Sequence, residues 1–195
     1  MFSCMKYILS TICLANLFIW NAFSQNFPLD PSGEILFQEV VQVDSLKKMD
    51  AYWKGVKWLN SLNDEQITLT KQDSLEGKLN ANSFFFVYDQ AGVFKKLSGK
   101  ISYSISIDVK DDKYRYSFTD FLFHYYKQDR NYNMVGTGKT KNLKDTEAKG
   151  WQKLWTRHRI STNAQLKRNI ELLKTTMKES PVIKNKKAQV KKVEW

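Results

Sequence analysis

The sequence of 195 residues contains two histidines, His124 and His158. Neither has a second His or a Cys at the spacing that zinc ligands need, so the sequence predicts no metal site. His158 lies on the apolar stripe of a predicted helix, and we expect it to be a buried, hydrogen-bonded core residue. His124 alternates with Phe123 and Tyr125 in a predicted strand, and we expect it to point to solvent.

Nucleophilic catalysis also lacks the groups that it requires. Both cysteines, Cys4 and Cys13, lie in an N-terminal leader, so the mature chain offers no thiolate nucleophile or metal ligand. Ser102, Ser104 and Ser106 share one face of a predicted strand, but the sequence supplies neither a base nor an orienting acid for them.

The paired carboxylates favour a structural role. Asp111–Asp112 and Asp64–Glu65 both fall in predicted turns, where Asp side chains usually hydrogen-bond the nearby backbone. We therefore expect no catalytic residue, no cofactor and no metal, and a protein that is not an enzyme. A hydrolase that the sequence does not reveal is the alternative.

The sequence of residues Gly136–Thr140 matches the last residues of a phosphate-binding loop motif. That motif needs a glycine at the position of Asn133, and it needs a strand before it and a helix directly after it. The helix is required because its first N–H groups hold the phosphate. The sequence shows no clear strand before this run and no helix directly after it, so we do not expect nucleotide binding.

The formal net charge is +11, which favours contact with anionic surfaces. Outside the cytoplasm the available anions are lipid head groups and acidic polysaccharides, and we expect no nucleic-acid partner. We hypothesise that an anionic envelope component, or another envelope protein, is the partner. A solvated face whose charge keeps the protein soluble is the alternative. The candidate contacts are Lys139, Lys141, Lys144, Lys149, Lys153, Arg157, Lys186 and Lys187.

Residues 1–24 have the layout of a secretory signal peptide. The apolar run Tyr7–Trp20 follows a short start with Lys6, and small residues precede a cleavage point after Ser24. A transmembrane anchor is the alternative, but the apolar run is about 14 residues, short of the roughly 20 that span a bilayer. We predict cleavage, export to the periplasm or the exterior, and no transmembrane anchor in the mature chain.

The elements that must position these residues are organised around one hairpin. Apolar residues alternate with Ser and Asp over Ile101–Val109, and aromatic residues alternate with polar ones over Tyr114–Phe118. A two-residue turn at Asp111–Asp112 would pair Val109 with Tyr114 and bring the two apolar faces together.

The alternation slips by one position after Phe118, because the next aromatic residues are Phe121 and Phe123. One extra residue at Thr119–Asp120 would return these rings to the same face of the sheet. We therefore predict a β-bulge at Thr119–Asp120.

The remaining segments complete an α+β pattern. Residues 127–149 are either a mobile excursion or contain a further short strand near 132–135. We predict a curved antiparallel sheet of about five strands, with a first short helix and a long C-terminal helix on one face. Residues 25–180 form the single domain, and 181–195 form a basic tail with too little apolar content to fold. The other predicted elements are strands at 34–43, 67–71 and 78–88, a helix at 45–62 capped by Asp44 or Ser45, and a helix at 148–178. The apolar stripe of the first helix is predicted to comprise Leu46, Met49, Tyr52, Trp53, Val56 and Leu59, with Trp58 off the stripe. The stripe of the long helix is predicted to comprise Trp151, Trp155, His158, Thr162, Leu166, Ile170, Leu173 and Met177.

The run Lys110–Tyr116, followed by Phe118–Asp120, resembles the centre of the DUF4468 family of secreted bacterial proteins. The strand from Gly33, the helix with Trp53 and Trp58, and the final long helix match the family in order. The resemblance implies a TBP-like fold and export in envelope-bearing bacteria. It implies no catalytic residues, and the fold label does not imply DNA binding.

The sequence thus favours an exported, non-enzymatic binding or interaction module of the bacterial envelope. The alternative is a protein that holds a small apolar ligand or lipid in a pocket between the sheet and the long helix. A core that simply fills this space is the competing explanation for the same aromatic residues. They are Tyr103, Tyr114, Tyr116, Phe118, Phe121, Phe123 and Trp155.

Overall fold

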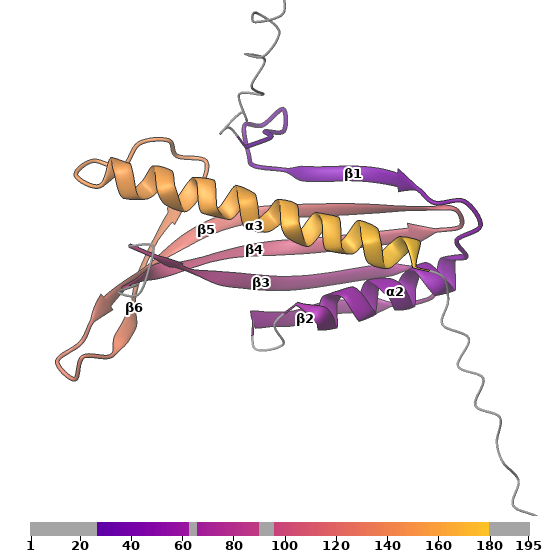
Figure 1. The fold of residues 1–195 in the computed structure, drawn as a ribbon, viewed down its shortest axis with the longest axis horizontal. Helices are drawn as coiled ribbons and strands as arrows, with labels where there is room; N and C mark the ends of the chain where they lie inside the picture. Colours follow the sequence, from indigo (N-terminus) through magenta and orange to yellow (C-terminus); the bar gives the residue numbers. More distant parts are fainter. Residues whose placement is uncertain (1–26, 63–65, 90–95, 180–195) are drawn as a thin grey trace, which may run out of the picture.

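Two helices lie on one face of a six-stranded antiparallel sheet in the computed structural model, which describes residues 27–62, 66–89 and 96–179 (Figure 1). The predicted α+β class is confirmed, with six strands in place of about five. The leader 1–24, the tail 181–195 and the pair Asp64–Glu65 lie outside the described residues. The elements are β1 (Phe37–Gln42), α2 (Lys48–Ser61), β2 (Ile67–Asp73), β3 (Lys78–Tyr88), β4 (Leu97–Lys110), β5 (Lys113–Gln128), β6 (Met134–Asn142) and α3 (Gln152–Lys178).

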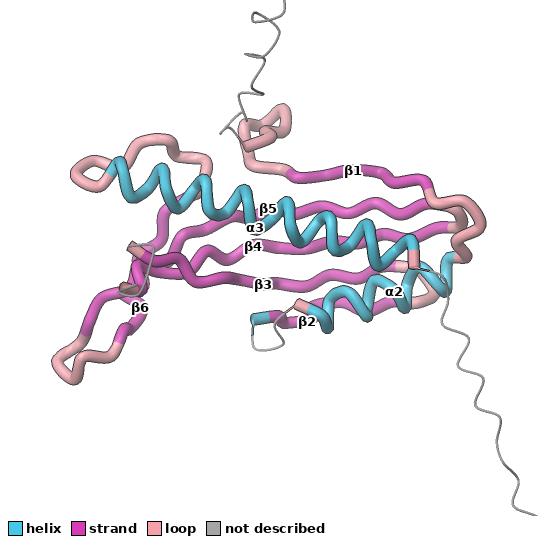
Figure 2. The backbone as a smooth tube through the Cα atoms, in the orientation of Figure 1, coloured by secondary structure: helices cyan, strands magenta, loops and turns pink. Residues whose placement is uncertain are grey.

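The strand order is β1-β5-β4-β3-β2, and β6 also pairs with β5. β1 pairs with the first part of β5, through Phe118, and β6 pairs with the later part, from Leu122 onward. Because β4 occupies the other side of β5, β1 and β6 both pair along the same side of β5. Figure 2 shows β1 at the top of the view and β6 at the lower left. β2 forms the opposite edge.

The central hairpin has the predicted register. Val109 pairs with Tyr114, Ile107 with Tyr116 and Ile105 with Phe118. Asp112 has a φ of 61°, the left-handed conformation that a tight hairpin turn requires.

The predicted bulge is also present. Ser102 pairs with Leu122 but Ser104 pairs with Thr119, so one extra residue of β5 lies opposite Tyr103. Asp120 takes a φ of 58° at this point. The extra residue turns Phe121 and Phe123 into the core beside Phe118, and all three are buried.

α2 begins at Lys48, later than predicted, and its cap comes from elsewhere. Ser45 has a φ of 63° and lies in a turn. Neither Asp44 nor Ser45 caps the helix; instead, Asp111 Oδ1 accepts a hydrogen bond from the Lys48 backbone N–H at 2.9 Å. The predicted cap was wrong because the oxygen that accepts from the Lys48 N–H belongs to Asp111 on the hairpin.

The buried stripe of α2 is rotated relative to the predicted one. Trp58 is fully buried, and its indole N–H donates to the Asn169 carbonyl oxygen in α3 at 3.1 Å, whereas Trp53 is 59% exposed. Gly55 explains the rotation, because a Cβ there would lie 2.8 Å from Leu79 of β3. The small residue lets this side of the helix approach the sheet closely.

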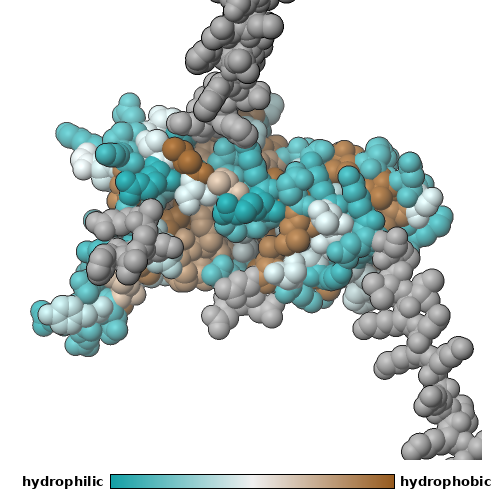
Figure 3. All heavy atoms as spheres, in the orientation of Figure 1, coloured by the Kyte–Doolittle hydropathy of each residue, from teal (hydrophilic) through white to brown (hydrophobic). Residues whose placement is uncertain are grey.

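α3 lies across the sheet with a continuous buried stripe, and its outward side is largely hydrophilic (Figure 3). None of the helices in the described parts of the chain is long and apolar enough to cross a membrane. The buried stripe is the predicted one and comprises Trp155, His158, Thr162, Leu166, Ile170, Leu173 and Met177.

Residues 127–149 contain β6, longer than the short strand considered for this region. Asp129 Oδ1 accepts hydrogen bonds from the backbone N–H groups of Asn131 and Asn133, which fixes the turn before β6. Gly136–Thr140 lies inside β6 with no helix directly after it, so the phosphate-loop geometry is absent there.

The edge strand β2 is irregular. Its register shifts between Leu69 and Lys71, which leaves Thr70 out of the pairing with β3. Ion pairs follow at its end, where Glu76 lies 3.2 Å from the ammonium of Lys71 and 3.0 Å from that of Lys78.

Candidate anion-binding pocket on the uncovered sheet face

The sheet face opposite α2 and α3, which we call the uncovered face, is polar along its centre. Ser104 Oγ donates to Asn82 Oδ1 at 3.3 Å, and Ser106 Oγ donates to Asn80 Oδ1 at 3.0 Å. These short side chains alternate with the buried core residues of β3 and β4, as period two requires.

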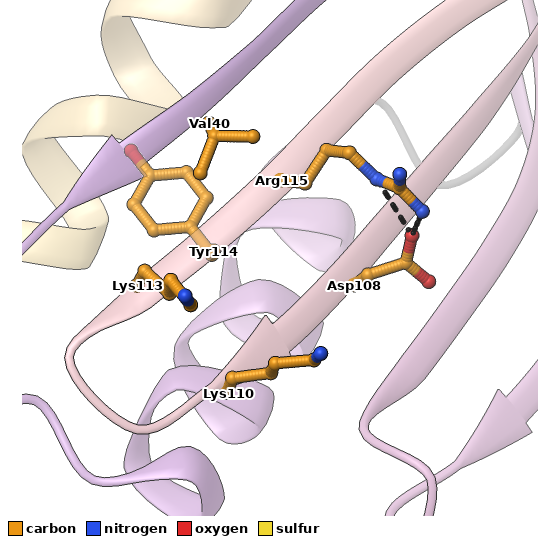
Figure 4. Close-up of a pocket in the computed structure, with 6 residues that line it drawn as sticks. All are labelled: Val40, Asp108, Lys110, Lys113, Tyr114 and Arg115. Atoms are coloured by element: carbon orange, nitrogen blue, oxygen red, sulfur yellow. Dashed lines mark hydrogen bonds and ion pairs between the residues drawn. The ribbon is translucent and has the colours of Figure 1, made fainter.

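A pocket of about 220 Å³ opens at the hairpin end of this face (Figure 4). β5 contributes Lys113 and Arg115, β4 contributes Asp108 and Lys110, and β1 contributes Val40. Three cationic groups and one carboxylate therefore surround the same small space. We call it the cationic pocket.

Lys110 and Lys113 are directly opposite each other in the ladder between β4 and β5. Both are exposed, and within the described residues neither forms an ion pair. Like charges at directly opposed positions destabilise a sheet, by roughly 0.2–1 kcal/mol. An anion bound between the two ammonium groups would relieve that repulsion.

Arg115 is held in place by Asp108. The guanidinium donates to one oxygen, Asp108 Oδ2, from Nε at 3.1 Å and from Nη2 at 2.5 Å (Figure 4). The two residues are also cross-strand partners. This pairing orders the guanidinium in advance and neutralises one of the three positive charges, so the pocket keeps an excess of positive charge.

Sequence reasoning missed these three cations, although the signal was present. The predicted register already places Lys110 opposite Lys113 and Arg115 opposite Asp108.

The predicted basic contacts lie at the other end of the sheet, on β6, the connection after it and the start of α3. Lys141 pairs with Asp145 at 3.1 Å and Lys144 pairs with Glu34, so both charges are partly neutralised. Arg157 donates to the Asp89 carbonyl oxygen. Lys139, Lys149 and Lys153 are exposed and have no ion pair among the described residues, and Lys186 and Lys187 lie outside them.

The predicted pocket-lining residues are packed together as core. Tyr103 lies 6.0 Å from Phe118 and 5.8 Å from Phe121 between ring centroids, and Phe123 lies 5.6 Å from Trp155. The space between sheet and α3 is therefore filled at these positions, and the residues do not line one open cavity. All seven, which are Tyr103, Tyr114, Tyr116, Phe118, Phe121, Phe123 and Trp155, are buried.

The histidines occupy different environments. His158 is the expected core residue, with Nε2 2.9 Å from Ser98 Oγ, and burial lowers its pKa to about 4. His124 does lie on the uncovered face but is half-buried, with Nε2 2.7 Å from Ser102 Oγ. Burial and then the nearby Lys100 charge lower the pKa of His124.

His124 could therefore act as a base for Ser102, a pairing that the sequence did not reveal. Within the described residues, however, no carboxylate hydrogen-bonds either imidazole, and Ser102 sits inside a β-strand. The third member of a nucleophilic triad is missing at both Ser–His pairs. No group of three or more His, Cys, Asp or Glu side chains in the described ranges is arranged to hold a metal ion.

Comparison with known families and solved structures shows which proteins this chain resembles. Residues 37–124 match the model of DUF4468, described as a domain of unknown function with a TBP-like fold. These residues form a DUF4468 domain. The DUF4468 match begins at β1 and ends within β5, so it contains the whole cationic pocket and stops before β6 and α3.

Two solved structures have a fold similar to that of this chain. A DUF4468 family protein from Bacteroides ovatus is 12% identical, with a TM-score of 0.54 over 82% of this chain and 94% of that one. A TBP-like protein from Parabacteroides distasonis is 14% identical, with a TM-score of 0.54 over 75% of this chain and 96% of that one. At these identities the likeness shows the fold alone. No curated protein sequence matches the chain significantly.

Proposed function

We propose that the protein is an exported, non-enzymatic binding module of the bacterial envelope that recognises an anionic group through Lys110, Lys113 and Arg115. The observation that carries the proposal is the cationic pocket, in which two lysines with no ion pair among the described residues are cross-strand partners beside an ordered guanidinium. Phosphate and carboxylate groups are the anions that such a site recognises. Both occur on lipid head groups and on acidic polysaccharides outside the cytoplasm.

Binding to vesicles with anionic lipid, compared with neutral vesicles, tests the proposal directly. We expect the mature protein to co-sediment with anionic vesicles and to be released as salt rises, because exposed charges are screened. A Lys110→Gln/Lys113→Gln variant should bind roughly 30-fold more weakly, since each lysine contributes about 1 kcal/mol near an anionic surface.

The matched control is Lys149→Gln/Lys153→Gln, which removes the same charge from the start of α3. Equal losses in the two variants would assign binding to total charge and not to the cationic pocket. Binding that is absent, or that does not respond to salt, would refute an anionic partner. Purified lipopolysaccharide and an acidic polysaccharide in place of vesicles identify which class of anion is bound.

A separate pocket under α3 favours the apolar ligand as a second candidate. It encloses about 250 Å³ between the end of α2, β3 and α3, and its walls include Phe85, Tyr103, Asn169 and Leu172. Native mass spectrometry of protein purified without detergent tests it. A retained lipid would support the second candidate, and its release by Leu172→Trp would place it in this pocket.

A further inference from the structure

A pocket of about 440 Å³ opens far from the cationic pocket, where the start of β4 and the later part of β5 meet the first turn of α3. It shares no lining residue with the cationic pocket. We call it the aromatic pocket, because Phe123, Tyr125 and Trp151 form one wall. In Figure 1 it belongs to the end of the sheet at which β6 and the start of α3 lie.

The aromatic wall is rigid but not closed. The Trp151 ring lies 5.5 Å from Tyr125 and 5.7 Å from Phe123 between centroids. Phe123 is buried, whereas Trp151 and Tyr125 are half-buried and keep part of their surface at the pocket. The ring planes are tilted, by 62° between Tyr125 and Trp151 and by 38° between Phe123 and Trp151, so one exposed ring face at a time can meet the apolar face of a ligand.

Polar groups face that wall and include an unused acceptor. Asp89 Oδ1 is buried and has no hydrogen-bond partner among the described residues. A buried acceptor without a donor is costly, so a ligand with an O–H or N–H group that reaches the Asp89 carboxylate is favoured. Ser98, also in the lining, is oriented by its 2.9 Å hydrogen bond to His158 Nε2.

The charge around the pocket favours an anionic substituent on the ligand. Lys96 and Lys127 line it, are exposed, and form no ion pair within the described residues. Trp151 is the N-cap of α3, where no side chain caps the helix and the first turn has no acidic residue. The positive end of the α3 dipole is therefore uncompensated beside the aromatic wall.

We propose that the aromatic pocket binds an acidic sugar unit, such as a uronic acid residue of a saccharide. A pyranose ring presents one apolar face of C–H groups to the Trp151 ring, and its hydroxyl groups donate to the Asp89 carboxylate. The carboxylate lies toward Lys127 and Lys96. This inference is independent of the function proposed for the cationic pocket, since no residue is common to both.

Titration of the mature protein with glucuronate, glucose and benzoate, followed by the indole N–H signals in NMR spectra, tests the inference. The signal of Trp151 is the one that disappears in Trp151→Phe. We expect glucuronate to shift this signal at lower concentration than glucose. Benzoate, which has the charge and a flat apolar face but no hydroxyl donors, should bind more weakly than glucuronate.

Two variants separate the contributions of charge and hydrogen bonding. Lys127→Gln should reduce the preference for glucuronate over glucose roughly two- to fivefold, as expected for an exposed ion pair. Asp89→Ala should weaken both sugars and leave benzoate unchanged. Lys113→Gln, in the cationic pocket, should alter none of these titrations, and circular dichroism checks that each variant is folded.

Three outcomes would overturn the inference. They are the absence of any shift of Trp151 with either sugar, benzoate binding as tightly as glucuronate, and sugar binding that Asp89→Ala does not weaken in a folded protein. Failure here would leave binding to anionic vesicles intact, because that property is assigned to Lys110 and Lys113.

Discussion

Asp111 Oδ1 accepts a hydrogen bond from the backbone N–H of Lys48 at 2.9 Å, across 63 residues of sequence. The same turn makes two backbone bonds to the segment before α2, because Asp112 N–H donates to Leu46 O and Val43 N–H donates to Asp112 O, each at 2.8 Å. The tip of the central hairpin therefore fixes where α2 begins. These bonds join the turn of the β4–β5 hairpin to the segment that leads into α2.

Loss of this cap should destabilise the protein measurably. We expect Asp111→Ala to lower the free energy of unfolding by about 1 kcal/mol, the usual effect of removing a helix cap. Asp111→Asn keeps an acceptor oxygen and should recover most of the loss. Urea denaturation of the three proteins provides the measurement. Equal stability of the Ala variant and the parent would show that the cap contributes nothing.

Tyr114 and Tyr116 offer a matched pair of hydroxyl deletions. Tyr116 O–H donates to Glu39 Oε2 at 2.7 Å, whereas the buried Tyr114 O–H has no partner among the described residues. Tyr114→Phe removes an unsatisfied group and should leave stability unchanged or raise it by about 1 kcal/mol, while Tyr116→Phe should cost about 1 kcal/mol. Thermal unfolding of both variants distinguishes these signs, and a larger loss in Tyr114→Phe would contradict the structure.

Gly99 lies where β4 and β5 approach most closely on the core side. A Cβ at this position would lie 2.3 Å from the His124 carbonyl oxygen and 2.7 Å from the Phe123 ring. We expect Gly99→Ala to cost at least about 1–3 kcal/mol through overpacking. Gly136→Ala is the control, because its Cβ would meet only the Tyr126 ring at 3.9 Å. Similar melting temperatures for the two variants would be incompatible with this packing.

His158 should make stability depend on pH. Burial is the main cause that lowers its pKa from 6.5 to about 4, the Arg157 charge adds to the lowering, and Asp89 opposes it. His158 therefore takes up a proton near pH 6.5 in the unfolded chain but only near pH 4 in the folded chain. Its contribution to the free energy of unfolding is fully present above pH 6.5 and is lost as pH falls toward 4, by on the order of 3 kcal/mol.

The comparison of parent and His158→Gln isolates that dependence from the contribution of the carboxylates. Denaturant midpoints should fall between pH 6.5 and 4 more steeply in the parent than in the variant. Parallel curves would mean that folding does not lower the pKa of His158. Glutamine also keeps a donor for Ser98, so the comparison separates the charge from the hydrogen bond.

Much of the fold could be predicted because alternation fixes a β-hairpin locally. The register of Val109 with Tyr114 and the bulge at Asp120 follow from period two alone, and both are observed. The α2 cap could not be predicted, since its two partners are joined only by tertiary structure. The position of Trp58 was wrong for a related reason. Hydrophobicity favoured a stripe through Trp53, but the small Gly55 decides which side of the helix meets the sheet.

The sites were harder to predict than the fold. The cationic pocket needs no more than the hairpin register and was within reach of the sequence. The aromatic pocket was not, because Asp89, Tyr125 and Trp151 come from three separate segments. The aromatic residues that suggested one cavity under α3 instead pack against one another, and the bulge turns those of β5 to the same side. An aromatic-rich sequence does not distinguish a filled space from an open one.

The irregular pairing of β2 has a consequence for the behaviour of the protein in concentrated solution. An edge strand with a regular row of free N–H and C=O groups invites a second molecule to extend the sheet. The register shift at Thr70 interrupts that row, and the exposed charge of Lys71 opposes close approach of another strand. β2 thereby closes the sheet to self-templated fibre growth without needing a helix to cover it.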